Sequence, residues 1–440
     1  MNKELYLQHV ARKLDVFRGF MAELGYEQLL ISSGQIKIQF QDDMSYPFKA
    51  NVYFKEWLPL NKRQDCFLLI SMDERPELYL NNAEDIWHTA PQNLPEGWDE
   101  PFDLGYFENH QQLAEQLNLD STKLVYLGED NEFKLPAERV NPVDLRNHVD
   151  YQRRFKTPYE HACMREANRI AASAHEAARK AFMSGASELQ IMAAYLEDCN
   201  CSENEMPYPV IAGLNEHAAV LHHFMLDRTA PAEHRSFLID AGVDVNGYAS
   251  DITRTYAFDP TCEFAEMIAV MDQKQQELVE AGAIGKSNIE LHKLSHLKIA
   301  EVLDQFNIIN VSAEEAVSSG LTNTFYPHGL GHGIGVNVHD KGGNLKDPSG
   351  ELIPAPAEYP RLRNTTDFVA TQVHTVEPGL YFIPALLNKL KGTELESKLN
   401  WDRVEAFIPY GGIRIEDNIV LHEDGTLENL TRDAQKALLG

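Results

Sequence analysis

The sequence has no long apolar run and few cysteines. None of its apolar runs approaches the roughly 20 residues of a membrane-spanning helix. The first residues, 1–14, are polar and lack the apolar core of a signal peptide. The five cysteines are odd in number and have no framework spacing, which argues against a disulfide scaffold. We therefore expect a soluble, cytoplasmic protein.

Positive charge is also scarce. The 440 residues include 39 Lys and Arg against 67 Asp and Glu, a formal net charge of −28. Proteins that bind nucleic acids or anionic membranes do so through clustered Lys and Arg. The balance therefore argues against either partner and favours a protein kept in solution by self-repulsion.

Several familiar signatures are missing. No repeat with a period of about 20–50 residues stands out, which argues against a solenoid. No Gly-x-Ser-x-Gly elbow is present, so a serine nucleophile of that kind is not expected. The glycine-rich run 329–335 could be taken for a dinucleotide loop, but Ile334 stands where the third glycine of that pattern belongs.

Length and local patterns predict two α/β domains, residues 1–155 and 156–440. Residues 29–34 and 66–70 are typical of buried strands. We expect them in a mixed sheet with helices on its faces.

A helix is predicted to open the second domain. Thr157 can cap it, Pro158 suits its first position, and Glu160 completes a capping box. Apolar residues, mostly alanine, then recur at helical spacing, and Gly185 is expected to end the helix.

Two aspartates are predicted to share one face of a β-hairpin. Asn246-Gly247 between apolar runs is a strong hairpin signal. A two-residue turn there sets Asp240 opposite Thr253, and Asp251, two residues from Thr253, projects on the same face. The Cα atoms of Asp240 and Asp251 would then lie about 7–8 Å apart. Each aspartate alone is more often a solvated residue at a strand end, but two beside a buried strand favour a shared cation.

Histidines cluster farther along the chain. His328, His332 and His339 lie within twelve residues, among glycines that allow close backbone approach. Imidazole nitrogen is a common ligand of divalent transition metals. The alternative is a glycine-rich turn around a buried, hydrogen-bonded histidine.

Two glutamates complete a candidate metal centre. Glu377 and Glu416 each lie in an apolar stretch of strand character, and Arg414 is expected on the same face as Glu416, where the two could simply form a salt bridge. Such an oxygen-rich set suits manganese better than structural zinc, and two ions about 3.5–4 Å apart acidify a shared water. The five candidate ligands are Asp240, Asp251, His332, Glu377 and Glu416.

Together these segments resemble the metal-binding segments of the pita-bread metallopeptidases. The chain is most similar to bacterial prolidases (Xaa-Pro dipeptidases), especially the organophosphorus acid anhydrolases, over essentially its whole length, including residues 40–48. The resemblance implies a curved, mostly antiparallel C-terminal sheet backed by helices, with two divalent ions, most simply Mn²⁺, on its concave face. It also implies hydrolysis of dipeptides ending in proline, with organophosphate triesters as side substrates.

The resemblance implies a role for each matched residue. Asp240 would bind one ion, Asp251 and Glu416 would bridge both, and His332 and Glu377 would complete the other. Glu377 would also move the proton of the attacking water. Matched pocket residues are His222, His328, His339, Arg414 and Tyr208. Arg414 and His339 would receive the proline carboxylate, a group that a guanidinium fork suits.

A homodimer, or a pair of such dimers, is also implied. Asp43 and Trp87 match positions that reach over the partner's site, with Asp43 the partner of the substrate's free amino group. The chain departs from its relatives at His223 and Met225, where they have Tyr and His, and at Gly333, where some have a second His. These departures leave the ligands intact and bear on the leaving-group pocket.

Three alternatives remain. An aminopeptidase acting on longer peptides would use the same ligands, although the Asp43 and Trp87 matches favour a dipeptidase. A metal-free binding module would not need the five ligands that this chain retains. A serine or cysteine nucleophile would reveal itself by full activity after chelation.

Overall fold

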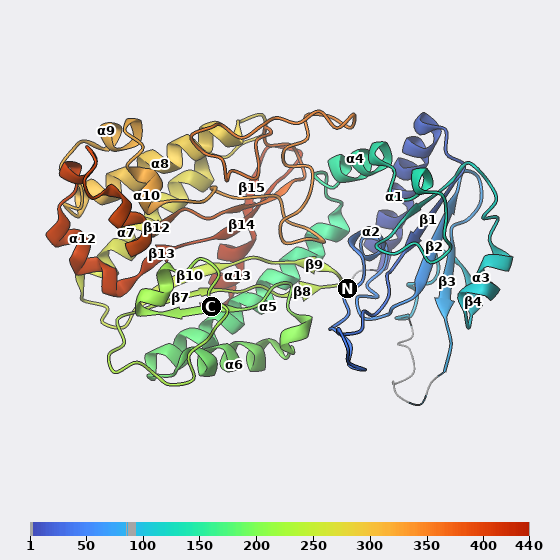
Figure 1. Cartoon of the computed structure of the whole chain (residues 1–440), viewed down its shortest axis with the longest axis horizontal. Coiled ribbons are helices and arrows are strands. Elements are labelled where there is room, and N and C mark those ends of the chain that lie inside the picture. Colours follow the sequence, from blue (N-terminus) through green and yellow to red (C-terminus); the bar gives the residue numbers. More distant parts are fainter. Residues whose placement is uncertain (1–2, 85, 87–93, 440) are drawn as a thin grey trace.

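The computed structural model describes residues 3–84, 86 and 94–439. The chain forms an N-terminal α/β body and a larger C-terminal body, and helix α5 lies on the side of the larger body that faces the smaller one (Figure 1). Within the described residues, no helix is long and apolar enough to cross a membrane.

The N-terminal body is built on a mixed five-stranded sheet in the order β4-β3-β2-β1-β5. Its edge pairs β1–β5 and β3–β4 are parallel and its inner pairs antiparallel. The two strands expected from the sequence are confirmed as β1 and β2. The strands are β1 (Gln28–Ser32), β2 (Cys66–Ser71), β3 (Glu77–Asn81), β4 (Asp103–Phe107) and β5 (Leu124–Leu127). The helices are α1 (Lys3–Leu24), α2 (Val52–Lys55), α3 (His110–Gln116) and α4 (Val143–Gln152).

Helix α5 (Pro158–Met183) begins as predicted. The Thr157 side chain accepts a hydrogen bond from the Glu160 amide, and Glu160 accepts one from the Thr157 amide, which is the capping box. Gly185, with φ of 84°, follows the last turn in the left-handed region that favours glycine. The helix starts six residues after α4 ends at Gln152; the division into two domains at residue 155 stays a prediction.

The C-terminal body holds short antiparallel sheets between helices. Sheets β10-β7-β6 and β11-β14-β15 are joined through an isolated bridge between Thr253 and Glu416. The strands are β6 (Ile211–Leu214), β7 (Ser236–Asp240), β8 (Asp244–Val245), β9 (Tyr248–Ala249), β10 (Thr253–Ala257), β11 (Val373–Val376), β12 (Gly379–Tyr381), β13 (Gly412–Arg414), β14 (Asp417–Leu421) and β15 (Leu427–Asn429). The helices are α6 (Glu188–Cys199), α7 (Glu263–Ala281), α8 (Asn288–Gln305), α9 (Ala313–Ser318), α10 (Thr322–Phe325), α11 (Pro384–Leu387), α12 (Trp401–Phe407) and α13 (Leu430–Leu439).

The predicted hairpin register is confirmed. Asn246 and Gly247 have φ of 53° and 92°, as a tight two-residue hairpin turn requires. Thr253 pairs with Asp240 across β10 and β7. Gly242 is needed inside the ladder, because a Cβ there would lie 1.9 Å from the Ser250 carbonyl oxygen. The hairpin therefore brings Asp240 and Asp251 to the same face.

Candidate metal centre

All five predicted ligands line one cavity of about 550 Å³ in the C-terminal body. Ligand atoms of Asp251, His332 and Glu416 lie within 4.8 Å of one another. The same cavity is lined by Leu221, His222, His328, Gly329, Gly331, His339, Arg361, Arg363 and Arg414. The five ligands, from four separate segments of the chain, thus line the same cavity.

The hairpin aspartates converge on a single hydroxyl group. The Tyr208 hydroxyl lies 2.8 Å from Asp240 Oδ1 and 2.5 Å from Asp251 Oδ1. Tyr208 thereby joins the two carboxylates that were expected to share a cation.

His332 faces the carboxylates from the opposite wall. Its Nε2 lies 3.5 Å from Asp251 Oδ2 and 3.5 Å from Glu377 Oε1. Its Nδ1 lies 3.1 Å from the Gly333 carbonyl oxygen, so the proton on Nδ1 leaves Nε2 to act as a ligand. Close packing fixes the segment, since a Cβ at Gly331 would lie 2.0 Å from the Thr375 carbonyl oxygen.

The apolar stretches around the two glutamates form strands, as predicted, and each glutamate lies in the short break between two of them. Glu377 lies between β11 and β12, before Pro378, which has no N–H to continue a ladder. Glu416 lies between β13 and β14 and pairs only with Thr253. Both carboxylates line the cavity from these interruptions.

Within the cavity, Glu416 carries a buried oxygen that no described residue hydrogen-bonds. Glu416 is 1% exposed; its Oε2 accepts from the Thr253 hydroxyl at 2.7 Å, while its Oε1 has no hydrogen-bond partner. An unpaired buried carboxylate oxygen carries a large desolvation cost unless a cation reaches it. The orphaned oxygen and the mixed carboxylate and imidazole donors therefore fit divalent metal ions.

The pKa values of the four carboxylates also indicate that this cavity needs a positive charge. Burial, together with the charge of Asp251, raises the pKa of Glu416 well above its usual value. Burial raises the pKa of Glu377 to about 7, and it raises that of Asp240 to about 6 although Arg414 lowers it. For Asp251, burial is the largest influence and raises the pKa, but the hydrogen bond and charge of His332, the hydrogen bond from Tyr208 and the charge of His339 together outweigh it and lower the pKa. These carboxylates repel one another until a cation neutralises them.

Arg414 is held tightly behind the predicted ligands. Its Nη2 donates to Asp240 Oδ2 at 2.6 Å, its Nη1 to the Tyr381 hydroxyl at 2.9 Å, and its Nε to the Thr253 hydroxyl at 3.0 Å. Arg414 and Glu416 both contact Thr253, so they share a face as expected. In this arrangement Arg414 orients Asp240.

Two of the predicted pocket histidines, His328 and His339, line the cavity as neutral imidazoles. Burial lowers the pKa of His328 to about 3, and its Nε2 lies 2.8 Å from the Tyr381 hydroxyl. Burial and the neighbouring His332 lower the pKa of His339 to about 3, and the two rings are 4.5 Å apart. His222 also lines the cavity.

Some residues fall outside these expectations. Arg361 and Arg363 line the cavity but were not predicted from the sequence. The available signal was two arginines separated by one residue in a polar segment. That pattern stands out only in a search for side chains that could bind a substrate carboxylate. Asp43 is exposed and does not line the cavity of its own chain. Trp87 lies outside the described residues.

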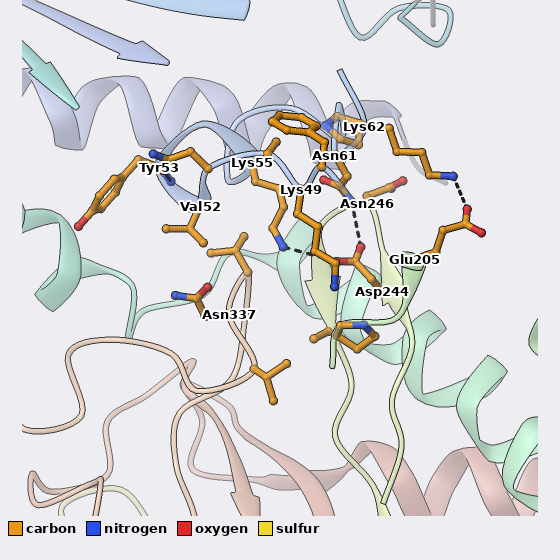
Figure 2. A pocket seen from close by; sticks show the side chains of 18 of the residues that line it. Lys49, Val52, Tyr53, Lys55, Asn61, Lys62, Glu205, Asp244, Asn246 and Asn337 are labelled. Carbon is orange, nitrogen blue, oxygen red and sulfur yellow. Dashed lines mark hydrogen bonds and ion pairs between the residues drawn. The ribbon is translucent and has the colours of Figure 1, made fainter. Parts of the chain in front are cut away.

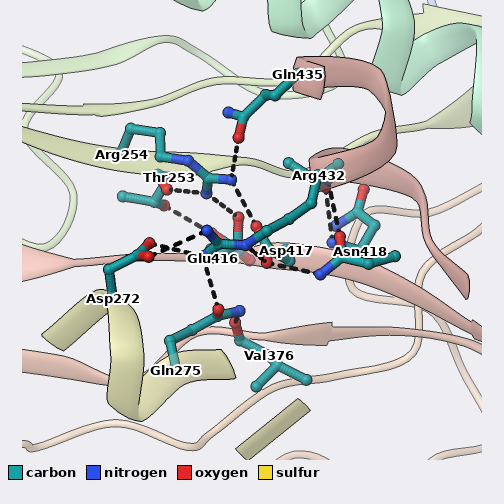
Figure 3. Close-up of polar contacts among 12 residues, drawn as sticks. Thr253, Arg254, Asp272, Gln275, Val376, Glu416, Asp417, Asn418, Arg432 and Gln435 are labelled. Carbon is teal, nitrogen blue, oxygen red and sulfur yellow. Dashed lines mark hydrogen bonds and ion pairs between the residues drawn. The ribbon is translucent and has the colours of Figure 1, made fainter. Parts of the chain in front are cut away.

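A buried ionic network supports the Glu416 segment (Figure 3). Arg254 donates to Asp417 Oδ1 at 2.6 Å and to the Glu416 carbonyl oxygen at 2.7 Å. Arg432 donates to Asp417 Oδ2 at 2.7 Å and to Asp272 at 2.7 Å. The backbone that carries Glu416 is therefore fixed from behind by charged groups.

Replacing Arg254 with Met is expected to destabilise the protein by about 3–5 kcal/mol, because Asp417 loses one of its two buried guanidinium partners. Arg165→Met is the control: its bidentate pair with Glu428 is half-exposed and should contribute less than about 1 kcal/mol. Urea unfolding of both variants measures the difference. Equal losses would contradict a supporting role for the network.

A larger cavity, of about 690 Å³, lies between the two bodies (Figure 2). Lys55 and Asn61 reach Asp244 there, at 3.5 and 3.1 Å, and Lys62 pairs with Glu205. No histidine is among the described residues that line it, and two of its lysines, Lys55 and Lys62, pair with carboxylates of the C-terminal body. Size alone therefore does not make it the reactive site.

The chain matches known proteins over its full length. Residues 162–423 match the model of metallopeptidase family M24, and residues 4–151 that of the Xaa-Pro dipeptidase N-terminal domain. It is 44% identical over 431 residues to the Xaa-Pro dipeptidase of Pseudoalteromonas translucida and 42% identical over 435 residues to that of Aeromonas hydrophila, covering 98% of each chain in both pairs.

Solved structures share the fold. Escherichia coli aminopeptidase P in its low-pH form has a TM-score of 0.70 at 23% identity, covering 100% of this chain and 98% of its own. Proline aminopeptidase P II from Yersinia pestis has a TM-score of 0.68 at 21% identity, covering 100% of both. The expected fold class is confirmed: a mixed-sheet α/β domain followed by a pita-bread domain.

Proposed function

Because the chain belongs to metallopeptidase family M24, we propose that it is a metal-dependent dipeptidase for dipeptides with C-terminal proline. The observation that carries the proposal is the convergence of Asp251, His332 and Glu416, with Glu416 Oε1 left unpaired inside a buried cavity. A binding module without metal would gain nothing from this costly arrangement.

The ligands are Asp240, Asp251, His332, Glu377 and Glu416, for two ions that we infer to be Mn²⁺ from the preponderance of carboxylate donors. When bound, such ions activate water and polarise the scissile carbonyl group. Glu377, whose pKa is raised to about 7, is suited to accept the proton of the water and return it to the leaving proline nitrogen. Bound cations will lower that pKa, which keeps the base ionised at neutral pH.

The positive side of the cavity suits the carboxylate of the substrate. Arg361 and Arg363 line it together with His339, which lies beside Arg363. A guanidinium group binds a carboxylate with two parallel hydrogen bonds. We assign the proline carboxylate to this side and assign Arg414, whose donors are engaged, mainly to holding Asp240. His222 and His328 complete the wall, and Tyr208 supports the site through its hydrogen bonds to Asp240 and Asp251.

Proline release from Ala-Pro after reconstitution with Mn²⁺ tests the proposal. We expect rapid release from the dipeptide and at least a tenfold lower kcat/KM for a tripeptide with proline second, because a third residue leaves the carboxylate beyond reach of the arginines. The same assay with Co²⁺ and Zn²⁺ ranks the ions. Preference for the tripeptide would favour an aminopeptidase, and full activity in chelator would exclude a metallopeptidase.

We further infer that two chains form a homodimer through residues 36–48. This segment exposes four large apolar side chains, which a monomer would leave in water: Ile38, Phe40, Met44 and Tyr46. Asp43 lies among them and is exposed, so a second chain would place its carboxylate over the neighbouring cavity, opposite the substrate's amino group.

The double variant Phe40→Ser/Met44→Ser should be monomeric by light scattering and should lose most discrimination between dipeptide and tripeptide. Tyr106→Ser is the control, since Tyr106 is also exposed but lies on edge strand β4. A double variant that remains dimeric would disprove this interface.

Organophosphate triesters are proposed as side substrates. Their tetrahedral phosphorus resembles the tetrahedral transition state of peptide hydrolysis, so one site serves both reactions. A cavity of about 550 Å³ has room for such a molecule. Release of the leaving group from a triester, compared in the wild type and in Glu416→Gln, is the measurement; equal rates would place the activity elsewhere.

A further inference from the structure

A second cluster of metal-ligating side chains lies outside the active cavity. It joins Glu188, the first residue of α6, to His217 and His223 in the following loop. The two carboxylate oxygens of Glu188 each face one ring: Oε1 lies 2.8 Å from His217 Nδ1, and Oε2 lies 2.8 Å from His223 Nε2. The three ligand atoms lie within 4.8 Å of one another.

The donors are oriented by the surrounding backbone. The amides of Leu214 and Asp227 donate to Oε1 and Oε2 of Glu188 at 2.9 and 2.7 Å. The two imidazole rings lie 4.5 Å apart at 37°. Amide hydrogen bonds to a ligating carboxylate are the outer contacts that typically fix a metal ligand.

The carboxylate is ionised at neutral pH. Burial would raise the pKa of Glu188, but hydrogen bonds from His223, from the amides of Asp227 and Leu214 and from His217 lower it to about 2. The set is therefore one carboxylate and two imidazoles, which suits Zn²⁺ and Co²⁺ better than it suits the harder Mn²⁺. Asp227 Oδ2, 4.0 Å from His217 Nδ1, stands on the exposed side, where a fourth ligand or water can enter.

We propose that Glu188, His217 and His223 form a third metal site, for a transition-metal ion of the zinc or cobalt class. Metal binding requires a change of tautomer in both rings. The proton moves from the nitrogen that faces Glu188, Nδ1 of His217 and Nε2 of His223, to the other ring nitrogen, and the facing nitrogen then offers its lone pair to the ion. The ion then cross-links α6 to residues 217–223. It lies behind Leu221 and His222, which line the active cavity, and stabilises that wall. The proposal does not depend on the reaction catalysed there.

Without a metal ion, the cluster would only hold the loop in place through hydrogen bonds. Substitution of the histidines by glutamine distinguishes this role from metal binding. In His217→Gln/His223→Gln, the amide N–H groups still donate to Glu188 but do not replace imidazole as zinc ligands. His234→Gln is the matched control, because His234 Nε2 lies 3.1 Å from the Ala186 carbonyl oxygen rather than from a carboxylate.

Metal content per chain, measured after dialysis against Zn²⁺ or Co²⁺, is the test. We expect three ions in the wild type and in His234→Gln, and two in the double glutamine variant. Glu416→Gln, which disrupts the active-site pair, should keep the cluster's ion and its histidine-nitrogen signature in X-ray absorption. Equal ion counts in the wild type and the double variant would leave the cluster only its hydrogen-bonding role and overturn the proposal. A far-ultraviolet circular dichroism spectrum matching the wild type shows that a lost ion does not reflect misfolding.

Discussion

The variant Glu416→Gln is expected to lose proline release by at least about a thousandfold, the largest effect of any single substitution in this protein. Glutamine has the shape of glutamate, and its carbonyl oxygen can still accept from the Thr253 hydroxyl. What it lacks is the charge at the position of Oε1, the buried oxygen with no protein partner. In the proposed site Glu416 would hold both ions, so its loss would weaken the binding of each and would forfeit several kcal/mol of transition-state stabilisation.

Two measurements accompany this variant. Elemental analysis should show that the active-site ions are lost, and steady-state kinetics should show that kcat falls more than KM rises. The control is Glu132→Gln: Glu132 is also largely buried and its pKa is raised, chiefly by burial, but it bonds Tyr126 in the N-terminal body. Its activity should stay within about twofold of the wild type. A fully active Glu416→Gln enzyme would show that Glu416 is not a metal ligand.

Local chemistry made part of the structure predictable from the sequence. The helix start at Thr157 and the turn at Asn246-Gly247 each depend on a few neighbouring residues, and both are confirmed. The hairpin register followed from the turn, which is why the shared face of Asp240 and Asp251 could be predicted.

Other features depend on contacts across the chain. The strands around Glu377 and Glu416 were expected because their neighbours are apolar, but the breaks in the ladder at Pro378 and at the lone bridge to Thr253 were not. The alternation of Arg361 and Arg363 does not by itself place them at the site, because their position in the cavity is set by the loop that returns them to the histidines. The Glu188 cluster spans three segments in the same way. Side-chain convergence is a tertiary property that spacing does not encode.

Removing the ions should make the carboxylates of the metal centre destabilise the folded protein increasingly as pH rises, a second large effect. In the metal-free protein, the pKa of Asp240 is about 6 and that of Glu377 about 7, and that of Glu416 is also raised. In the unfolded chain all three lie near about 4. Between pH 5 and 8 these carboxylates therefore hold more protons in the folded protein than in the unfolded chain, so their contribution to stability declines as pH passes through 6–7. Buried neutral histidines such as His328 and His339, whose pKa values are lowered, contribute with the opposite sign below about pH 6.5. The pKa of Asp251 is lowered, so its contribution changes only below its usual value, outside this window.

With Mn²⁺ the trend should reverse, because the ions bind only the folded, deprotonated ligands. Urea unfolding at pH 5.5 and pH 8, in chelator and in Mn²⁺, measures both cases. We expect the raised pKa values of these carboxylates to cost the metal-free protein a few kcal/mol over this range, at about 1.4 kcal/mol for each pKa unit. Metal-free Glu416→Gln should lose less, since a neutral amide removes one repelling charge from the cavity. Histidines and carboxylates elsewhere titrate alike in the wild type and in Glu416→Gln. The difference between the two proteins in how the free energy of unfolding changes with pH therefore reports on the metal-centre carboxylates. Parallel slopes would mean that these carboxylates do not repel one another in the folded state.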